Sequence, residues 1–436
     1  MGRSHRLSIV VAAMALLVLV AGGTGLLTGC GGSDTPVASG TPSAGAMTAA
    51  LRPMADFKLV ATPLESEVEF TGDRVVWRVP PQDVGPRGPW PDVEVSSFDI
   101  AGGATTTDEW LTGLLSRRAV TEWVLAGDRV AWIDISETVG GVDGYDDLFD
   151  TSVYTATRGW PAREVSSPAW SAPGDSGRFE PAAWGLACNE MLVTWFGRRS
   201  ELAPETPKGV KEVEGGYLWA WDATDGGRHR LADQVDEARL AVGGRRVFTA
   251  APPSPASSSY PKSTIHAWDA ATDTRSTIRQ DDLAQSPAAA DEKTLVWTVM
   301  PPMATDFVDV DLAGCDLASG KTLPVSRAPG GQSNPAVDGD LVVWVDTPLG
   351  SNSALPDASW PLSTLRGIQL SRLGANAEST LVENPFTDES EDSPFNDVTL
   401  IGDRLFWTIM RDDACTAYGA RVVVGADGLT LEPLRD

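Results

Sequence analysis

The chain has 436 residues, of which 60 are acidic and 34 basic, so its formal net charge is −26. A field of this sign repels nucleic acids and anionic lipid surfaces, and we therefore expect no nucleic-acid partner. An acidic surface also keeps an exported protein soluble, so candidate partners are cationic, neutral or bridged by a metal ion. The four cysteines show no Cys-x-x-Cys or Cys/His spacing, which argues against a structural zinc site.

The first residues have the pattern of a secretory signal. Arg3 and Arg6 precede an apolar run from Leu7 to Val20, and Leu27-Thr28-Gly29-Cys30 follows. This tetrad resembles the lipobox of bacterial lipoproteins. The resemblance implies cleavage before Cys30, diacylglycerol on its sulfur and an extracytoplasmic protein anchored to the bacterial cell membrane by an N-terminal lipid. The alternatives are an ordinary secretory signal or an uncleaved anchor helix.

A flexible tether is predicted behind the lipidated cysteine. Residues 1–29 are then the signal peptide, and residues 30–53 are rich in Ser, Thr, Pro, Gly and Ala, a composition that cannot bury enough surface to fold. About 20 flexible residues would hold the remaining domain, residues 54–436, roughly 25 Å from the lipid. Lipidation of Cys30 would leave Cys188, Cys315 and Cys415, which allow at most one internal disulfide.

Seven repeats determine the expected fold. In each, a small polar turn precedes a short apolar strand that ends on an aromatic ring, and the rings lie 47 to 63 residues apart. The copies are Gly72–Trp77, Gly127–Trp132, Asn189–Trp195, Gly243–Phe248, Glu292–Trp297, Gly339–Trp344 and Gly402–Trp407. All-strand units of this period cannot bury their apolar faces alone. We predict an all-β propeller of seven four-stranded blades, with six or eight as the alternatives.

The sixth repeat shows the expected blade most clearly. Strands are predicted at Pro335–Val337, Leu341–Val345, Leu365–Leu370 and Ser379–Val382, with an Asp338-Gly339 hairpin turn between the first two. The repeated aromatic is expected to be a wedge between blades. Helix signals are almost absent after Ala50. The last blade could be completed by Phe57–Thr62 from the start of the domain or by Leu429–Leu434 from its end.

These motifs resemble those of the TolB-like propellers, in which a P-x-x-x-G-D turn precedes an apolar strand that ends in an aromatic. The resemblance covers about Glu65 to Asp436 and implies a propeller fold. The usual S-P-D-G turn of that family appears here only as Val337-Asp338-Gly339-Asp340, and seven units are visible where the family often has six. The motifs specify a fold and not an activity.

One face of the predicted propeller carries the long connections, and binding residues concentrate in such loops. The long second-to-third connections are Pro80–Pro91, Ser136–Asp150, Gly197–Gly216 and Thr347–Thr364. The candidate binding face consists of Trp90, Trp170, Trp360, Asp388, Glu389, Glu391 and Asp392. An aromatic, acidic surface suits a basic protein segment or a sugar. Alternatively, each Trp plugs its own loop against the blade.

Catalytic and metal motifs are scarce. Gly174-Asp175-Ser176-Gly177 is similar to the nucleophile segment of trypsin-like proteases, but the partner motifs are missing, and no G-x-S-x-G elbow exists. The acidic loop of Asp143, Asp146, Asp147 and Asp150 is a weak calcium candidate, because it lacks the spacing of a Ca²⁺ loop. No other cofactor is predicted.

We therefore predict a membrane-tethered propeller of the cell envelope that binds a protein or glycan partner through its long-loop face without catalysis. The alternative is an extracytoplasmic carbohydrate-active or calcium-dependent enzyme with a site at the channel mouth. Carboxylates that converge there from three or more blades would favour the enzyme, and a broad loop surface would favour binding.

Overall fold

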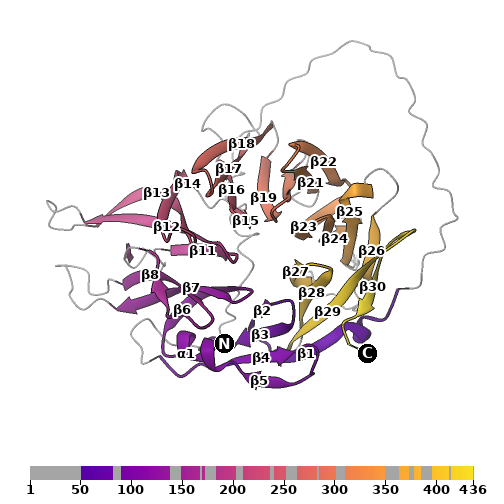
Figure 1. Cartoon of the computed structure of the whole chain (residues 1–436), viewed down its shortest axis with the longest axis horizontal. Coiled ribbons are helices and arrows are strands. Elements are labelled where there is room, and N and C mark those ends of the chain that lie inside the picture. Colours follow the sequence, from indigo (N-terminus) through magenta and orange to yellow (C-terminus); the bar gives the residue numbers. More distant parts are fainter. Residues whose placement is uncertain are drawn as a thin grey trace, which may run out of the picture. The chain divides into compact units, whose positions relative to one another are not determined.

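The computed structural model describes residues 51–81, 90–137, 149–166, 169–171, 183–202, 210–235, 240–251, 263–281, 284–300, 310–348, 363–372, 378–383, 395–411 and 414–435. All of them belong to one compact unit, Thr48–Asp436. Within this unit seven antiparallel sheets surround a common axis (Figure 1). The predicted all-β propeller with seven four-stranded blades is confirmed.

The blades follow one another in chain order, and within each blade the strands succeed one another from the axis outward. Blade 1 contains β2 (Glu67–Phe70), β3 (Arg74–Arg78), β4 (Val95–Asp99) and β5 (Thr105–Thr107). Blade 2 contains β6 (Ala119–Ala126), β7 (Arg129–Glu137) and β8 (Phe149–Thr157), with β9 (Arg163–Glu164) and β10 (Ala169–Ser171) both paired to β8. Blade 3 contains β11 (Ala183–Cys188), β12 (Leu192–Leu202), β13 (Val210–Asp222) and β14 (Arg228–Val235). Blade 4 contains β15 (Leu240–Gly243), β16 (Arg246–Ala251), β17 (Ser263–Asp269) and β18 (Thr274–Asp281).

The remaining blades repeat the pattern. Blade 5 contains β19 (Ala284–Ala290), β20 (Thr294–Met300), β21 (Asp311–Asp316) and β22 (Lys321–Ser326). Blade 6 contains β23 (Gly330–Asp338), β24 (Leu341–Pro348), β25 (Thr364–Gln369) and β26 (Ser379–Glu383). Blade 7 contains β27 (Phe395–Ile401), β28 (Arg404–Arg411) and β29 (Ala414–Gly425), with β1 (Lys58–Pro63) and β30 (Gly428–Pro433) outside it. Among the described residues, two short 3₁₀ turns, η2 (Met54–Phe57) and η3 (Leu370–Arg372), and one α-helix complete the elements.

All seven repeated rings are buried, and six of them wedge against the preceding blade. Trp344, for example, is fully buried and packs against Val296 and Leu312 of blade 5. The fourth copy differs, because Phe248 packs against Leu295 and Trp297 of the following blade. Phe248 is the third residue of its strand, whereas the ring of every other copy is the fourth. Successive side chains of a strand point to opposite faces, so this shift of one position turns the Phe248 ring around. Trp268 of β17 packs against blade 3 in its place.

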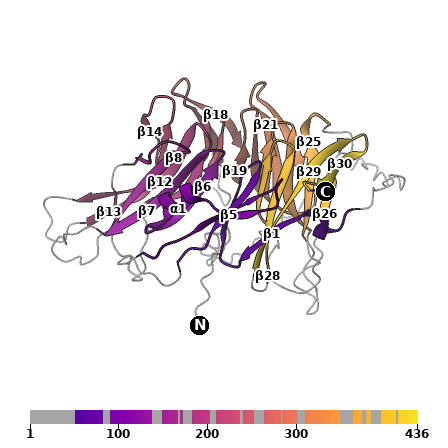
Figure 2. The ribbon, with the colours of Figure 1, turned by 60° about the horizontal axis from the view of Figure 1, so that its bottom comes forward.

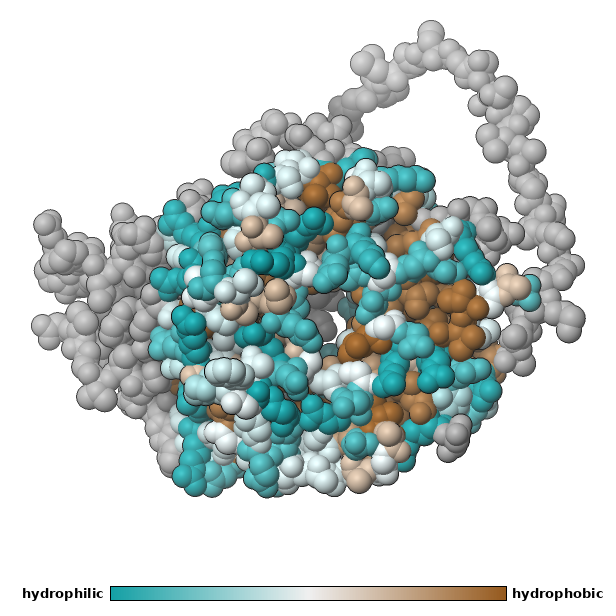
Figure 3. Space-filling view, viewed as in Figure 1, coloured by the Kyte–Doolittle hydropathy of each residue, from teal (hydrophilic) through white to brown (hydrophobic). Residues whose placement is uncertain are grey.

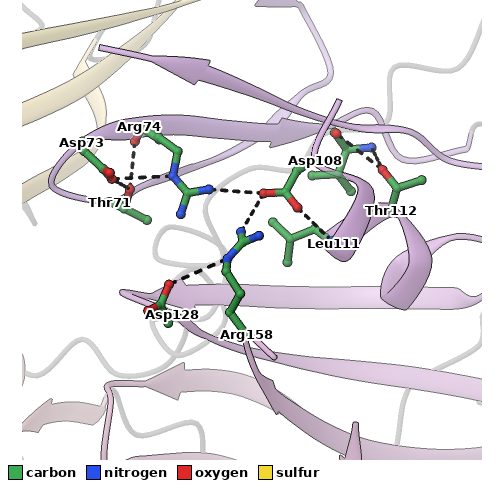
Figure 4. A network of polar contacts seen from close by, with 9 residues as sticks. Thr71, Asp73, Arg74, Asp108, Leu111, Thr112, Asp128 and Arg158 are labelled. Atoms are coloured by element: carbon green, nitrogen blue, oxygen red, sulfur yellow. Dashed lines mark hydrogen bonds and ion pairs between the residues drawn. The ribbon is translucent and has the colours of Figure 1, made fainter. Parts of the chain in front are cut away.

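One helix was missed by the sequence analysis. α1 (Glu109–Leu115) follows β5, and the Asp108 carboxylate caps it by accepting a hydrogen bond from the Leu111 amide at 3.0 Å. Leu111 and Leu115 are fully buried against the core between blades 1 and 2. Asp108 also binds Arg74 at 3.3 Å and Arg158 at 2.8 Å, which joins these two blades (Figure 4). A seven-residue helix is too short for a periodic signal to stand out.

Both chain segments that were expected to compete for the last blade take part in it. β1 pairs with β29 from Ala414 to Tyr418, and β30 pairs with the same edge of β29 from Ala420 to Gly425. The outer position of blade 7 is therefore shared by the two segments, end to end. Phe57, just before β1, contacts Trp407 edge to face at a ring-centroid distance of 6.0 Å.

The two ends of the strands differ, and we call them the turn side and the loop side. On the turn side, the turns between the first and second strands bond directly to the next blade. The bonds run from Arg129 Nε to Glu190 O (2.9 Å), Asn189 Nδ2 to Gly244 O (2.7 Å), Thr294 Oγ1 to Gly339 O (3.1 Å), the Gly402 amide to Asp338 Oδ2 (2.7 Å) and Arg404 Nη1 to Gly72 O. Side-chain and backbone groups thus close the ring turn by turn.

The loop side carries the second-to-third connections. One of the four predicted long loops is largely strand: β12 extends to Leu202 and β13 starts at Val210, so most of Gly197–Gly216 forms a two-stranded ribbon. At 13 residues β13 is the longest described strand, and its ribbon reaches beyond the neighbouring strands in Figure 2. None of the helices formed by the described residues is long and apolar enough to span a membrane.

Candidate functional site: the loop side and the inner strands

Most residues predicted for the binding face lie outside the described residues. These are Trp360, Asp388, Glu389, Glu391 and Asp392, together with Asp143, Asp146 and Asp147 of the weak calcium candidate. Cys30 also lies outside them. The structure therefore leaves their roles as predictions.

Three predicted residues fall within the described part of the chain: Trp170 and Asp150 in blade 2, and Trp90 in the connection between β3 and β4 of blade 1. Trp170 in β10 and Asp150 in β8 are direct cross-strand partners. Trp90 is half-buried and packs on Ala119 and Ile135, where β6 begins and β7 ends. Trp90 therefore covers the loop-side end of blade 2, which is the plugging role considered beside binding in the sequence analysis.

Ion pairs mark the loop-side ends of three second strands. Arg78, only 1% exposed, binds Glu67 Oε2 at 2.6 Å through Nε and the Val120 carbonyl at 2.8 Å through Nη2. Asp134 binds Arg118 at 2.6 Å in blade 2. In blade 6, Asp346 binds Arg366 at 3.3 Å. Buried ions are stable only when paired, so these pairs hold the strand ends rigid beneath the loops.

Bulges re-aim side chains on the inner strands. Pairing shifts by one residue or more within β6, β11, β19, β23 and β27, which are five of the seven innermost strands. Three bulges contain a residue with positive φ: Gly185 (64°), Asn334 (46°) and Asp397 (48°). A bulge twists the strand locally and turns a side chain out of the regular alternation. In β27 the side chain placed in this way is the Asp397 carboxylate.

Carboxylates from three blades approach one another along the inner strands. Glu69 of β2 accepts a hydrogen bond from the Leu125 amide of β6 at 3.4 Å, and Glu122 of β6 accepts one from the Leu186 amide of β11 at 2.8 Å. Asp397 of β27 accepts a hydrogen bond from Thr408 Oγ1 at 2.7 Å. The first two carboxylates thereby bond each blade to the next at mid-strand, which supplements the turn-side bonds. Around the central opening the surface is mixed: teal polar residues border it on the left of Figure 3, and brown apolar residues reach it on the right.

The proximity of these acids shifts their ionisation. Burial, together with the negative charges of Asp397, Glu67 and Glu122, raises the pKa of Glu69 from 4.5 to about 8, although the hydrogen bond from the Leu125 amide lowers it. Burial also raises the pKa of Asp397. Glu69 is therefore largely protonated at neutral pH. Burial, with a smaller contribution from Glu69, raises the pKa of the Cys188 thiol, which makes Cys188 a poor nucleophile.

The cluster has the ingredients of acid chemistry but not those of a metal site. A carboxyl whose pKa is raised by burial, as that of Glu69 is, is a feature that general acids share. Among the described residues, no three His, Cys, Asp or Glu side chains are grouped so as to hold a metal ion. The described cysteines, Cys188, Cys315 and Cys415, are free thiols. A signal for this cluster was present in the sequence, because Glu67, Glu69 and Glu122 interrupt otherwise apolar strands.

The fold and the site together define a seven-bladed β-propeller with three carboxylates on its inner strands. No family model matches the sequence, and no curated protein matches it significantly.

Solved structures share the fold at low identity. The β-propeller domain of the trilobed protease from Pyrococcus furiosus matches with a TM-score of 0.50 and 8% identity, over 83% of this chain and 95% of that chain. Pyrococcus horikoshii acylaminoacyl peptidase gives a TM-score of 0.51 and 8% identity over 80% of this chain and 49% of that chain, so this chain spans about half of the peptidase. TolB from Acinetobacter baumannii gives 0.34 and 12%, over 84% and 82%. At these identities the likeness is one of fold, and function follows from the site alone.

Proposed function

We propose that the protein is an extracytoplasmic propeller, tethered to the membrane by lipid on Cys30, that binds a protein or glycan partner of the cell envelope through its loop side without catalysis. Fold likeness to peptidase propellers supplies no activity, because a propeller hosts many functions. The proposal rests on the difference between the two ends of the strands.

The two sides differ in how their polar groups are used and in what holds the ends of the strands. On the turn side, side chains and backbone groups of adjacent turns are used to bond blade to blade. On the loop side, the ends of the second strands are fixed by the buried pairs of Arg78, Asp134 and Asp346, and long connections leave from them. Loops on a rigid scaffold are the usual place for binding residues.

One observation favours the alternative, an enzyme of the channel. Glu69, Glu122 and Asp397 converge from three blades, which is the arrangement expected of an enzyme from the sequence. However, two of these three carboxylates accept backbone amides of the next blade, and the third accepts a hydroxyl of its own blade. Such contacts account for the carboxylates as parts of the ring, so we retain the enzyme as the second candidate.

Crosslinking and capture from membranes test the proposal. A captured partner would be titrated against a loop-side variant in which Asp388, Glu389, Glu391 and Asp392 become Asn or Gln, and against a matched turn-side variant, Asp403→Asn with Asp427→Asn. We expect slower association and weaker salt dependence only in the loop-side variant, because rim charges act through steering. Loss of binding only in the turn-side variant would reject the assigned face. Loss of an activity in Glu69→Gln with binding intact would favour the enzyme.

A further inference from the structure

The outer edge of β29 is divided between two strands that come from opposite ends of the domain. β1 pairs with the residues from Ala414 to Tyr418, and β30 pairs with those from Ala420 to Gly425. The two sets of pairs do not overlap. Among the described strands, β1 pairs with β29 alone, and β30 does the same. Each strand can therefore leave its half of the edge without breaking a pair of the other.

The two strands are attached to the ring in different ways. A two-residue turn, Ala426-Asp427, joins β30 to β29, and six successive pairs follow without a register shift. The pairing of β1 is irregular, because its register shifts between Lys58 and Val60 and leaves four successive pairs up to Pro63. Pro63 also has no amide hydrogen to donate. Of the two strands, β1 therefore has the weaker hold on β29.

We call η2 and β1 together, Met54–Pro63, the strap, and three of its side chains fasten it. Phe57 belongs to the apolar cluster between blades 6 and 7, whereas Leu59 belongs to the cluster between blades 7 and 1. Thr62 Oγ1 donates a hydrogen bond to the Cys415 carbonyl at 3.1 Å. In β1, Lys58, Ala61 and Pro63 are exposed. The other buried members of both clusters belong to the blades, so both seams remain apolar without the strap.

We propose that the strap is releasable: it detaches from β29 as one unit, while β30 keeps blade 7 and the ring closed. An edge segment that few buried side chains hold is the kind of segment that opens before the whole fold does. The open state leaves the outer edge of β29 unpaired from Ala414 to Tyr418. It also lets the chain ahead of Met54 move without moving the blades. The proposal does not depend on the partner of the loop side, so either can fail alone.

Native-state hydrogen exchange on the full-length chain, solubilised in neutral detergent, tests the release. It compares two sets of amides on the same edge, those that bond β1 to β29 and those that bond β30 to β29. We expect the strap set to share one opening constant, at least about tenfold larger than that of the β30 set. Equal protection of the two sets would overturn the proposal, because the strap and the blade would then open together.

A pair of matched variants separates the strap from the ring. Phe57→Ala with Leu59→Ala should speed exchange of the strap set by about a hundredfold or more, up to the unprotected limit, because two buried side chains are lost. The control, Leu429→Ala with Leu431→Ala, removes two buried side chains of β30 and should lower the thermal midpoint further than the strap variant does. An equal or larger fall in the strap variant would make the strap an integral part of the ring and reject its independent release.

A disulfide tests the same release in the opposite direction. Ala61 and Thr416 are direct cross-strand partners. In Ala61→Cys with Thr416→Cys, a disulfide between positions 61 and 416, identified by mass spectrometry, should slow exchange of the strap set to the level of the β30 set. The reduced form of the same variant is the control and should exchange like wild type. Exchange that is equally fast in the oxidised and reduced forms would show that the strap does not open as a unit.

Discussion

The Glu122 carboxylate of blade 2 accepts a hydrogen bond from the Leu186 backbone amide of blade 3 at 2.8 Å, so an acid inside one strand satisfies the main chain of the next blade. Gly185, just before this amide, has a φ of 64°, which belongs to the bulge that turns the amide toward blade 2. Bulge and carboxylate therefore act as one interblade joint.

Removing the acceptor should destabilise the ring. Glu122→Ala leaves the Leu186 amide without this partner, and we expect a loss of about 1 to 3 kcal/mol in the free energy of unfolding. Glu122→Gln keeps a carbonyl acceptor and should cost less. Urea unfolding of the two variants measures the difference. Equal losses would mean that the charge, and not the hydrogen bond, matters at this joint.

Glu69 should make stability fall as pH rises. Its pKa is about 8 in the folded protein and 4.5 as an ordinary glutamate, so between these values the folded state retains a proton that the unfolded state has lost. The unfolding free energy therefore decreases between pH 4.5 and about 8. Glu69→Gln stays neutral at every pH. We expect it to lie close to wild type near pH 4.5 and to exceed it by about 4 kcal/mol at pH 8. A difference that does not change with pH would contradict the raised pKa.

The wedge role of the repeated rings predicts unequal costs for two tryptophans. Trp344 is fully buried between blades 5 and 6, whereas Trp160 in a turn-side hairpin is 72% exposed. Trp344→Ala should cost roughly 3 to 5 kcal/mol, because a cavity opens between the blades. Trp160→Ala should change stability by less than about 0.5 kcal/mol. Similar thermal midpoints for the two variants would disprove the wedge role.

The lipid anchor is tested separately from the fold. Cys30→Ala should abolish labelling by a radioactive fatty acid and release the domain from membranes, or leave an unprocessed precursor. The matched control is Cys188→Ala, which removes a thiol of β11 and should leave labelling unchanged. Persistent labelling in Cys30→Ala would place the lipid elsewhere.

The repeats predicted the fold because each copy combines a turn, an apolar strand and a ring that only a neighbouring blade can bury. Phe248 shows the limit of this inference, because the fourth copy looks like the others in sequence, whereas its ring is the third and not the fourth residue of its strand and faces the other blade. α1 was missed because its stability comes from the Asp108 cap and from the burial of Leu111, which are tertiary contacts and not periodicity.

The sequence shows the acids of the inner strands but does not indicate that they lie close together in the fold. Glu69 and Glu122 are far apart in the chain, and only the ring closure together with the bulge at Asp397 brings their blades and blade 7 into one electrostatic cluster. The distances between these acids depend on the number of blades and on the tilt of the strands, and neither can be predicted from a local sequence pattern. Among the loop-side candidates only Trp90 has a described environment, and it packs on blade 2, the blade that follows its own loop.

The shared outer strand of blade 7 makes the ring continuous except for one break in the covalent chain. β30 runs along β29 to Pro433, β1 continues in the same direction from Lys58, and Gly419 lies opposite the break, where an added Cβ would touch both Leu59 and Leu434. A short peptide joining residue 435 to residue 57 would close a circle. This circular domain should then fold when the backbone is opened at any exposed turn-side hairpin, such as Asp427-Gly428. The architecture of the propeller therefore does not depend on which blade comes first in the chain.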